Sequence, residues 1–141
     1  RVLAGSRDHA RTPMQWTKDK YAGFSAVEPW IGMDEDYKIC NVEDQMKAED
    51  SVLNYYRQLI QLRKSHPALI YGDVAIVNKK TRDLFTYYRQ DGEELFYVEC
   101  NLSRKKLKRR AKPNGVRLLS NYREDTDKEL RPYEATVWRL K

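Results

Sequence analysis

SRDHARTPMQW, residues 6 to 16, is the stretch on which the interpretation of this 141-residue chain depends. It has neither a helical nor a strand period, and Pro13 forces the backbone at Thr12 into an extended or turning conformation. Arg7 and Arg11 flank an Asp-His pair, and Trp16 adds a large apolar surface that can anchor the loop. Guanidinium donors on a loop held by a tryptophan are typical of a binding site, although a surface loop with ion pairs fits the same residues.

This motif resembles the RD-x-x-R-T-P loop of the oligo-1,6-glucosidase and isomaltase group of glycoside hydrolase family 13. Dextran glucosidases and sucrose-active α-glucosidases of that family are similar. The resemblance keeps the same order along the chain, is specific up to Gly72, and is thin from about Asn78 to Glu129. Its other matching segments are Ala22–Ser25, Glu28–Trp30, Asn41–Glu43, Ser51–Tyr56, Leu59–Lys64, Tyr71–Gly72 and Leu130–Ala135.

The resemblance implies the C-terminal portion of such an enzyme, and therefore an α+β chain. Residues 1–50 are expected to form the long loop after the eighth strand of a (β/α)8 barrel, and Ser51–Ser65 its last helix. We therefore expect residues 1–66 to end the catalytic barrel domain and residues 67–141 to form an antiparallel all-β C-terminal domain. The start of the chain, with no leading Met and no signal-peptide pattern, fits a fragment.

The resemblance also implies substrate-binding roles. In oligo-1,6-glucosidases the first arginine of the motif grips the non-reducing glucose in subsite −1, and this role carries over to Arg7. We expect Arg11 to shape the loop or the +1 side, and we assign no role to His9. Trp16 and Trp30 are expected to be packing anchors for the loop rather than sugar platforms.

Catalysis is expected to come from residues outside this chain. Retaining glycoside hydrolysis needs two carboxyl groups about 5–5.5 Å apart. Asp8 is the one acid in a plausible site loop, and it has no identifiable carboxyl partner. The family's nucleophile, acid/base glutamate and stabilising aspartate all lie upstream of the matching region. We expect this chain alone to be inactive, and the parent protein to be a retaining α-glucosidase that cleaves α-1,6 bonds at the non-reducing end of isomalto-oligosaccharides without a cofactor.

Charge is concentrated in one segment. The net charge is +6, and the bases between Arg104 and Lys112 contribute +7, so the remainder carries −1. A basic nucleic-acid-binding β module is therefore a second hypothesis, although the segment lacks the aromatic residues that single-strand binders interleave, and we expect no nucleic-acid partner. A third hypothesis is a carbohydrate-binding module with a platform built from Tyr87, Tyr88 or Phe96. Strand alternation would bury one of these two tyrosines and expose the other.

Periodicity predicts helices first and strands afterwards. Asn41–Lys47 reads as a short helix, and Ser51–Ser65 as a longer one capped by Asp50 or Ser51. The period changes to two after Pro67, which predicts an antiparallel β-sandwich. Its expected strands are Asp73–Val77, Leu84–Arg89, Leu95–Asn101, Val116–Ser120 and Thr136–Leu140.

Several other features limit the possible partners and the location. No apolar run approaches the roughly 18 residues of a membrane helix, so no membrane partner is expected. Cys40 and Cys100 suggest the free thiols of a cytoplasmic protein, and they make no metal-ligand spacing with the two histidines. The apolar stripe of Ser51–Ser65 has no obvious partner within the chain, so we expect self-association through this helix.

Overall fold

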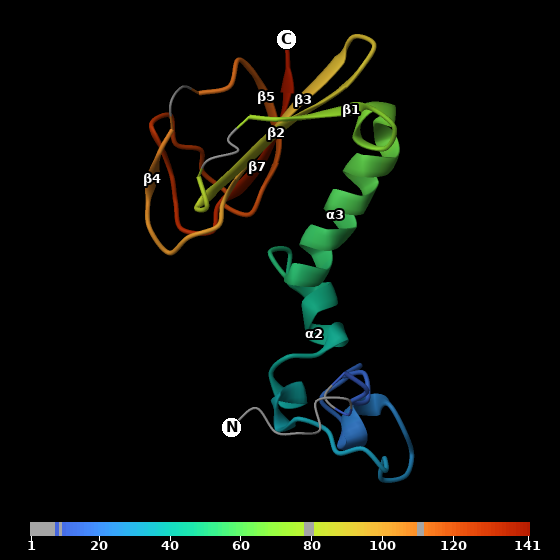
Figure 1. Cartoon of the computed structure of the whole chain (residues 1–141). Coiled ribbons are helices and arrows are strands. Elements are labelled where there is room, and N and C mark those ends of the chain that lie inside the picture. The colour runs from blue at the N-terminus through green and yellow to red at the C-terminus, as the bar shows by residue number, and fades with distance from the viewer. Residues whose placement is uncertain (1–7, 9, 78–80, 110–111) are drawn as a thin grey trace. The chain divides into compact units, whose positions relative to one another are not determined.

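The computed structural model describes residues 8, 10–77, 81–109 and 112–141. The chain divides into two compact units, Arg1–Tyr56 and Arg57–Lys141 (Figure 1). Each unit has its own internal bonding. The sequence-based boundary after residue 66 concerns the complete protein and stays a prediction.

The first unit consists of loops with short helical turns. It contains η1 (Lys20–Gly23), η2 (Glu35–Lys38), α2 (Val42–Lys47) and the first turn of α3. Among its described residues, Pro13 and Ala22 are the two apolar residues that are buried. The unit is therefore held together mainly by polar contacts.

A tight turn after Trp16 gives this unit its local shape. The amides of Trp16 and Thr17 both donate to the carbonyl of Ala22, at 2.9 and 3.0 Å. Tyr21, Ala22 and Gly23 all have positive φ, at 55°, 54° and 64°. A Cβ at position 23 would lie 2.7 Å from the Thr17 hydroxyl oxygen, so the turn requires glycine there.

The motif ends against the start of α2. The Asn41 side chain caps this helix by accepting from the Asp44 amide at 2.9 Å, and Asn41 is almost fully buried. The amides of Val42 and Glu43, which lack partners inside the helix, donate to the carbonyls of Gln15 and Trp16, both at 2.9 Å. This pairing fixes the C-terminal end of the motif. The predicted short helix is confirmed.

Helix α3 (Val52–Ser65) confirms the second predicted helix. Ser51, rather than Asp50, is the cap, because its hydroxyl accepts from the Asn54 amide at 3.1 Å. No side chain on α3 is buried, and its largely exposed apolar residues are Val52, Tyr56, Leu59 and Ile60.

The second unit is built on an antiparallel sheet with the strand order β1-β2-β3-β7-β5. All five predicted strands are present. Gly92 starts the two-residue loop between β2 and β3 with a φ of 55°, the conformation that glycine supplies in tight hairpins. The strands are β1 (Asp73–Ile76), β2 (Leu84–Asp91), β3 (Glu94–Asn101), β5 (Gly115–Ser120) and β7 (Ala135–Leu140).

The predicted sandwich has only one full sheet. In place of the second sheet there is a ladder of two-residue strands, β4 (Leu107–Lys108) and β6 (Glu129–Leu130). Most residues between β3 and β7 lie in loops. Ion pairs, rather than strand pairing, hold these loops in place. The antiparallel β prediction therefore holds, and the prediction of two comparable sheets does not.

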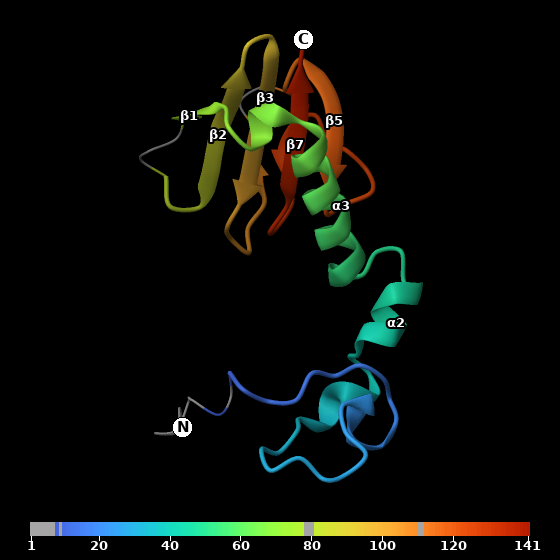
Figure 2. The ribbon, with the colours of Figure 1, turned by 90° about the vertical axis from the view of Figure 1, so that its right-hand side faces the viewer.

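Both faces of the sheet are covered. On one face, the C-terminal half of α3 and η3 (Pro67–Leu69) lie over Tyr87, Val98 and Val137 (Figure 2). On the other face, Trp138 is 2% exposed beneath the Arg109 guanidinium. Tyr87 and Tyr88 are consequently both half-buried, so the expectation that one would be exposed is wrong.

Candidate functional site

The described part of the SRDHARTPMQW motif forms a turn followed by an extended segment. The Arg11 amide donates to the Asp8 carbonyl at 3.0 Å, and the two side chains form an ion pair at 3.7 Å. Pro13 is buried, so the backbone directly after Thr12 is held in place by packing. The Arg11 guanidinium is therefore held at the exposed edge of the loop, where a ligand can reach it.

Arg11 also contacts an aromatic ring from further along the chain. Its guanidinium carbon lies 5.3 Å from the centre of the Trp30 ring, within the range of a cation–π interaction. Trp30 is 79% exposed and Trp16 is 48% exposed. Both rings therefore keep much of their surface open in this chain, and the interpretation of Trp16 and Trp30 as packing anchors, which concerns the complete enzyme, stays a prediction.

Three motif residues, Ser6 among them, have no described position. Arg7, the predicted subsite −1 residue, and His9 lie outside the described residues. The role of Arg7 stays a prediction. The structure does bring Arg11 together with Asp8 and Trp30. The contact with Trp30 could not be foreseen from the sequence, because no spacing rule links an arginine in a turn to a distant tryptophan.

The chemistry available in this loop is binding rather than catalysis. A guanidinium is a rigid fork of donors suited to carboxylates and sugar hydroxyls, and an indole ring offers a flat apolar face. Within the described ranges, no group of three or more His, Cys, Asp or Glu side chains could hold a metal ion. The described residues of this loop can orient a polar ligand, and they provide no catalytic groups for bond cleavage.

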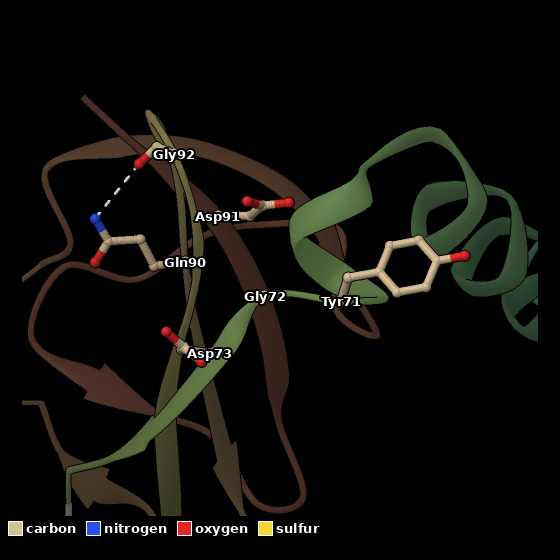
Figure 3. Close-up of a pocket in the computed structure, with 6 residues that line it drawn as sticks. All are labelled: Tyr71, Gly72, Asp73, Gln90, Asp91 and Gly92. Carbon is tan, nitrogen blue, oxygen red and sulfur yellow. Dashed lines mark hydrogen bonds between the residues drawn. The ribbon is translucent and has the colours of Figure 1, made fainter.

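A polar cavity in the second unit is another candidate. It is lined by Tyr71, Gly72, Asp73, Gln90, Asp91 and Gly92. Figure 3 shows the Tyr71 ring on one side of the strands and the side chains of Asp73 and Gln90 on the other. Because these groups do not point to a common position, the cavity presents no converging set of ligand contacts.

The three aromatic residues that were candidates for a sugar platform, Tyr87, Tyr88 and Phe96, are packed against other groups of the fold. Phe96 is fully buried, while Tyr87 packs on Phe85 and Tyr88 on Tyr97 at ring-centre distances of 5.3 and 5.0 Å. The candidates required by the hypothesis of a carbohydrate-binding module are therefore used within the fold.

The basic segment is partly neutralised by nearby acids. Lys106 pairs with Glu129 at 2.7 Å, and Lys112 pairs with Asp125 and Asp127 at 3.0 and 2.6 Å. These contacts hold the pKa of the Lys112 ammonium above its usual value, with the hydrogen bond to Asp127 as the largest cause. Arg110 lies outside the described residues. The charge available for phosphates is thus smaller than the count of bases indicates.

One buried carboxyl has a perturbed pKa. Burial raises the pKa of Glu99, while Arg109 at 2.6 Å lowers it again in part. Perturbed carboxyls often mark active sites. Here both side chains are only 2% exposed. No ligand could reach Glu99 without opening the core, so we interpret this pair as structural.

The sequence matches a family model described as "Alpha amylase, catalytic domain" over residues 2–72. It is 40% identical to a probable oligo-1,6-glucosidase 2 of Bacillus subtilis (strain 168), over 99% of this chain and 26% of the relative. It is 39% identical to an alpha-glucosidase of Candida albicans, over 94% of this chain and 24% of the relative. The chain thus spans about a quarter of the length of these curated relatives.

Solved structures match the same extent of chain. The trehalose-6-phosphate hydrolase of Bacillus licheniformis superimposes with a TM-score of 0.86 at 29% identity, covering 95% of this chain and 26% of that structure. The isomaltulose synthase of Klebsiella sp. LX3 gives a TM-score of 0.85 at 30% identity, covering 96% and 26%. Enzymes whose names describe hydrolysis and synthesis therefore share this part of the fold.

Proposed function

Because this chain belongs to the alpha-amylase family of glycoside hydrolases, we propose that it is the C-terminal portion of a retaining α-glucosidase. The enzyme hydrolyses α-1,6-glucosidic bonds at the non-reducing end of isomalto-oligosaccharides. This portion contributes a substrate-positioning loop and a stabilising β domain, and the catalytic carboxylates come from the remaining part of the enzyme. The enzyme acts in the cytoplasm.

The observation that carries this proposal is the 40% identity to a probable oligo-1,6-glucosidase along 99% of the chain. A further relative, the oligo-1,6-glucosidase of Parageobacillus thermoglucosidasius, is 37% identical over the whole chain. The match to the catalytic-domain model ends at residue 72, next to β1, the first strand of the antiparallel sheet. This position supports a domain boundary close to residue 66, with the all-β domain after it.

The proposal gives each part of the chain a place in the enzyme. Residues 1–50 form the loop after the eighth strand of a (β/α)8 barrel, and α3 is the last barrel helix. Active sites of such barrels are built from the loops at the C-terminal face of the strands. In that position, Arg7 holds the terminal glucose and Arg11 lies on the side of the departing sugar.

The test is to assay the complete protein and the 141-residue chain side by side. Isomaltose incubated with the complete protein should yield glucose, and NMR should detect an initial excess of the α-anomer over the equilibrium mixture, because retention preserves the configuration of the non-reducing unit. The chain alone should release no glucose above buffer. A complete protein that leaves isomaltose intact would refute the function, and turnover by the repurified chain would refute the assignment of the carboxylates.

A further inference from the structure

We propose that Asn114 is a site of spontaneous covalent modification, at which intramolecular deamidation turns it into aspartate or isoaspartate. The Gly115 backbone nitrogen attacks the carbonyl carbon of the Asn114 side chain, and the new N–C bond closes a succinimide ring. The side-chain nitrogen leaves as ammonia, which takes the proton of the Gly115 amide. Water then opens the ring on either side. The inference is independent of the proposed function.

The sequence supplies the first argument. Asn114 is the only asparagine of the chain that is followed by glycine. Asparagine is a thermolabile residue, and ring closure requires the next backbone nitrogen to reach its side-chain carbonyl carbon. Glycine has no Cβ to obstruct this approach and leaves the backbone free to adopt the conformation that it needs. The attacking nitrogen is therefore the least hindered one that any asparagine of this chain has beside it.

The pairing of β5 with β7 supplies the second argument. The Lys141 amide donates to the Asn114 carbonyl at 3.2 Å, so these two opposed residues form a hydrogen-bonded pair. The next opposed residues, Gly115 and Leu140, then form a pair that exchanges no hydrogen bonds, because the two kinds of pair alternate in an antiparallel ladder. The Gly115 N–H thus points away from β7, and β5 has no second neighbour in the described sheet. Its nitrogen can attack without the loss of a ladder bond.

The state of the side chain supplies the third argument. The Asn114 side chain forms no hydrogen bond with another residue of the described ranges. Asn121, which directly follows β5, differs in each respect. Its side chain donates to the Tyr133 carbonyl at 2.8 Å and accepts from the Ala135 amide at 2.9 Å, and its next residue is Tyr122. Rotation toward the following nitrogen would break both of these bonds, so the fold protects Asn121 and leaves Asn114 reactive.

Isoaspartate at position 114 would disturb the start of β5. Its main chain passes through the former side-chain carbons and is one atom longer, and the carbonyl that accepts from Lys141 becomes part of a free carboxylate. The backbone beside it is closely packed, since a Cβ on Gly115 would lie 2.2 Å from the Arg139 carbonyl oxygen. The lengthened chain cannot keep this approach, so the modification should loosen the pairing of β5 with β7.

The test incubates the 141-residue chain in mildly alkaline buffer beside two synthetic peptides, residues 112–117 and 119–124. Mass spectrometry follows the exchange of NH2 for OH at each asparagine, and an isoaspartyl methyltransferase with a labelled methyl donor measures isoaspartate. Asn114 in the chain should react within about tenfold of the rate in its peptide, whereas Asn121 should react at least about tenfold more slowly than in its own peptide. Asn114→Gln should remove the isoaspartate signal, because glutamine closes the larger ring more slowly.

Two results would overturn the site. One is a rate at Asn114 more than about a hundredfold below that of its peptide, and the other is an isoaspartate signal that persists in Asn114→Gln. An unprotected Asn121 would refute the contrast between the two positions, because the fold would then not control the reaction.

The effect on β5 is measured separately. The isoaspartyl chain, isolated by ion exchange, should exchange the amide hydrogens of Val116 and Arg139, the next bonded pair, about tenfold faster than the unmodified chain. Asn114→Asp is the matched control, because it adds the charge without lengthening the backbone, and freshly prepared it should exchange as wild type does. Equal exchange in the isoaspartyl chain would show that the modification leaves the pairing intact, against the proposal.

Discussion

Arg7 carries the predicted substrate contact that matters most at the scale of a single residue. In the complete enzyme, Arg7→Ala should remove a charged donor from the site, and such a donor contributes about 1.5–3 kcal/mol. We expect kcat/KM to fall by about tenfold to a hundredfold, with little change in melting temperature, because a loop residue adds little to the core. Wild-type kinetics in this variant would show that Arg7 does not contact the substrate.

Arg109 is the residue with the most consequential buried contact. Its guanidinium meets Glu99 at 2.6 Å, and Glu99 also accepts from the Thr136 hydroxyl at 3.2 Å. Removing one member of a buried ion pair leaves the other charge uncompensated, at a cost of about 3–5 kcal/mol. Arg109→Ala should therefore lower the free energy of unfolding by about this amount, measured by urea denaturation of the 141-residue chain.

A matched double variant separates the ion pair from ordinary packing. Arg109→Met with Glu99→Leu removes both charges and keeps most of the volume, so much of the lost stability should return. If the double variant unfolds as early as Arg109→Ala, the deficit comes from lost packing on Trp138, whose ring centre lies 5.8 Å from the guanidinium carbon.

At the scale of elements, the end of α3 is tied to the start of β3. His66 follows the helix, and its Nδ1 lies 2.8 Å from the Glu94 carboxylate. The His66 ring also packs edge-on against Phe96 at a ring-centre distance of 5.0 Å. The hydrogen bond from His66 holds the pKa of Glu94 below its usual value of 4.5.

This contact predicts a dependence of stability on acid. Because the pKa of Glu94 is lower in the folded state, its contribution is fully present above the unfolded pKa of 4.5 and is lost as pH falls through the lower folded value. Glu94→Gln should therefore narrow the difference in melting temperature between pH 7 and pH 3. Calorimetry across this range measures it. A variant with the wild-type acid slope would show that His66 does not favour the ionised carboxylate.

At the scale of the whole molecule, the apolar stripe of α3 determines how the chain behaves alone. Val52, Tyr56 and Ile60 are 67%, 58% and 49% exposed. Large apolar side chains gain roughly 1.5–3 kcal/mol each on burial. We expect the 141-residue chain to self-associate through Ser51–Ser65 at micromolar concentration, which light scattering can measure.

Leu59→Glu is the variant that tests this interface. Leu59 is 37% exposed, so a charge at this position stays partly in water in the monomer and would be buried in a dimer. The variant should scatter as a monomer at concentrations where the wild-type chain does not. A wild-type chain with strictly monomeric mass would contradict the prediction.

In the described part of the chain, no helix is both long and apolar enough to span a bilayer.

The sequence by itself determined the local elements and the family. Helix α3 and five strands were predictable because their patterns lie within short windows, where apolar periodicity reports which face is buried. The motif at residues 6–16 pointed to the family because its residue types are unusual together. The predicted roles of Arg7 and Arg11 came from the same motif, not from periodicity.

The tertiary structure alone decided which distant residues meet. The Arg11–Trp30 contact, the Arg109–Glu99 pair and the β4–β6 ladder each join segments that no local pattern links. The exposure of Tyr87 and Tyr88 also depended on what covers each face of the sheet. Burial and pairing across the chain follow from the summed packing of all elements, and local propensity carries no information about which partner a side chain finds.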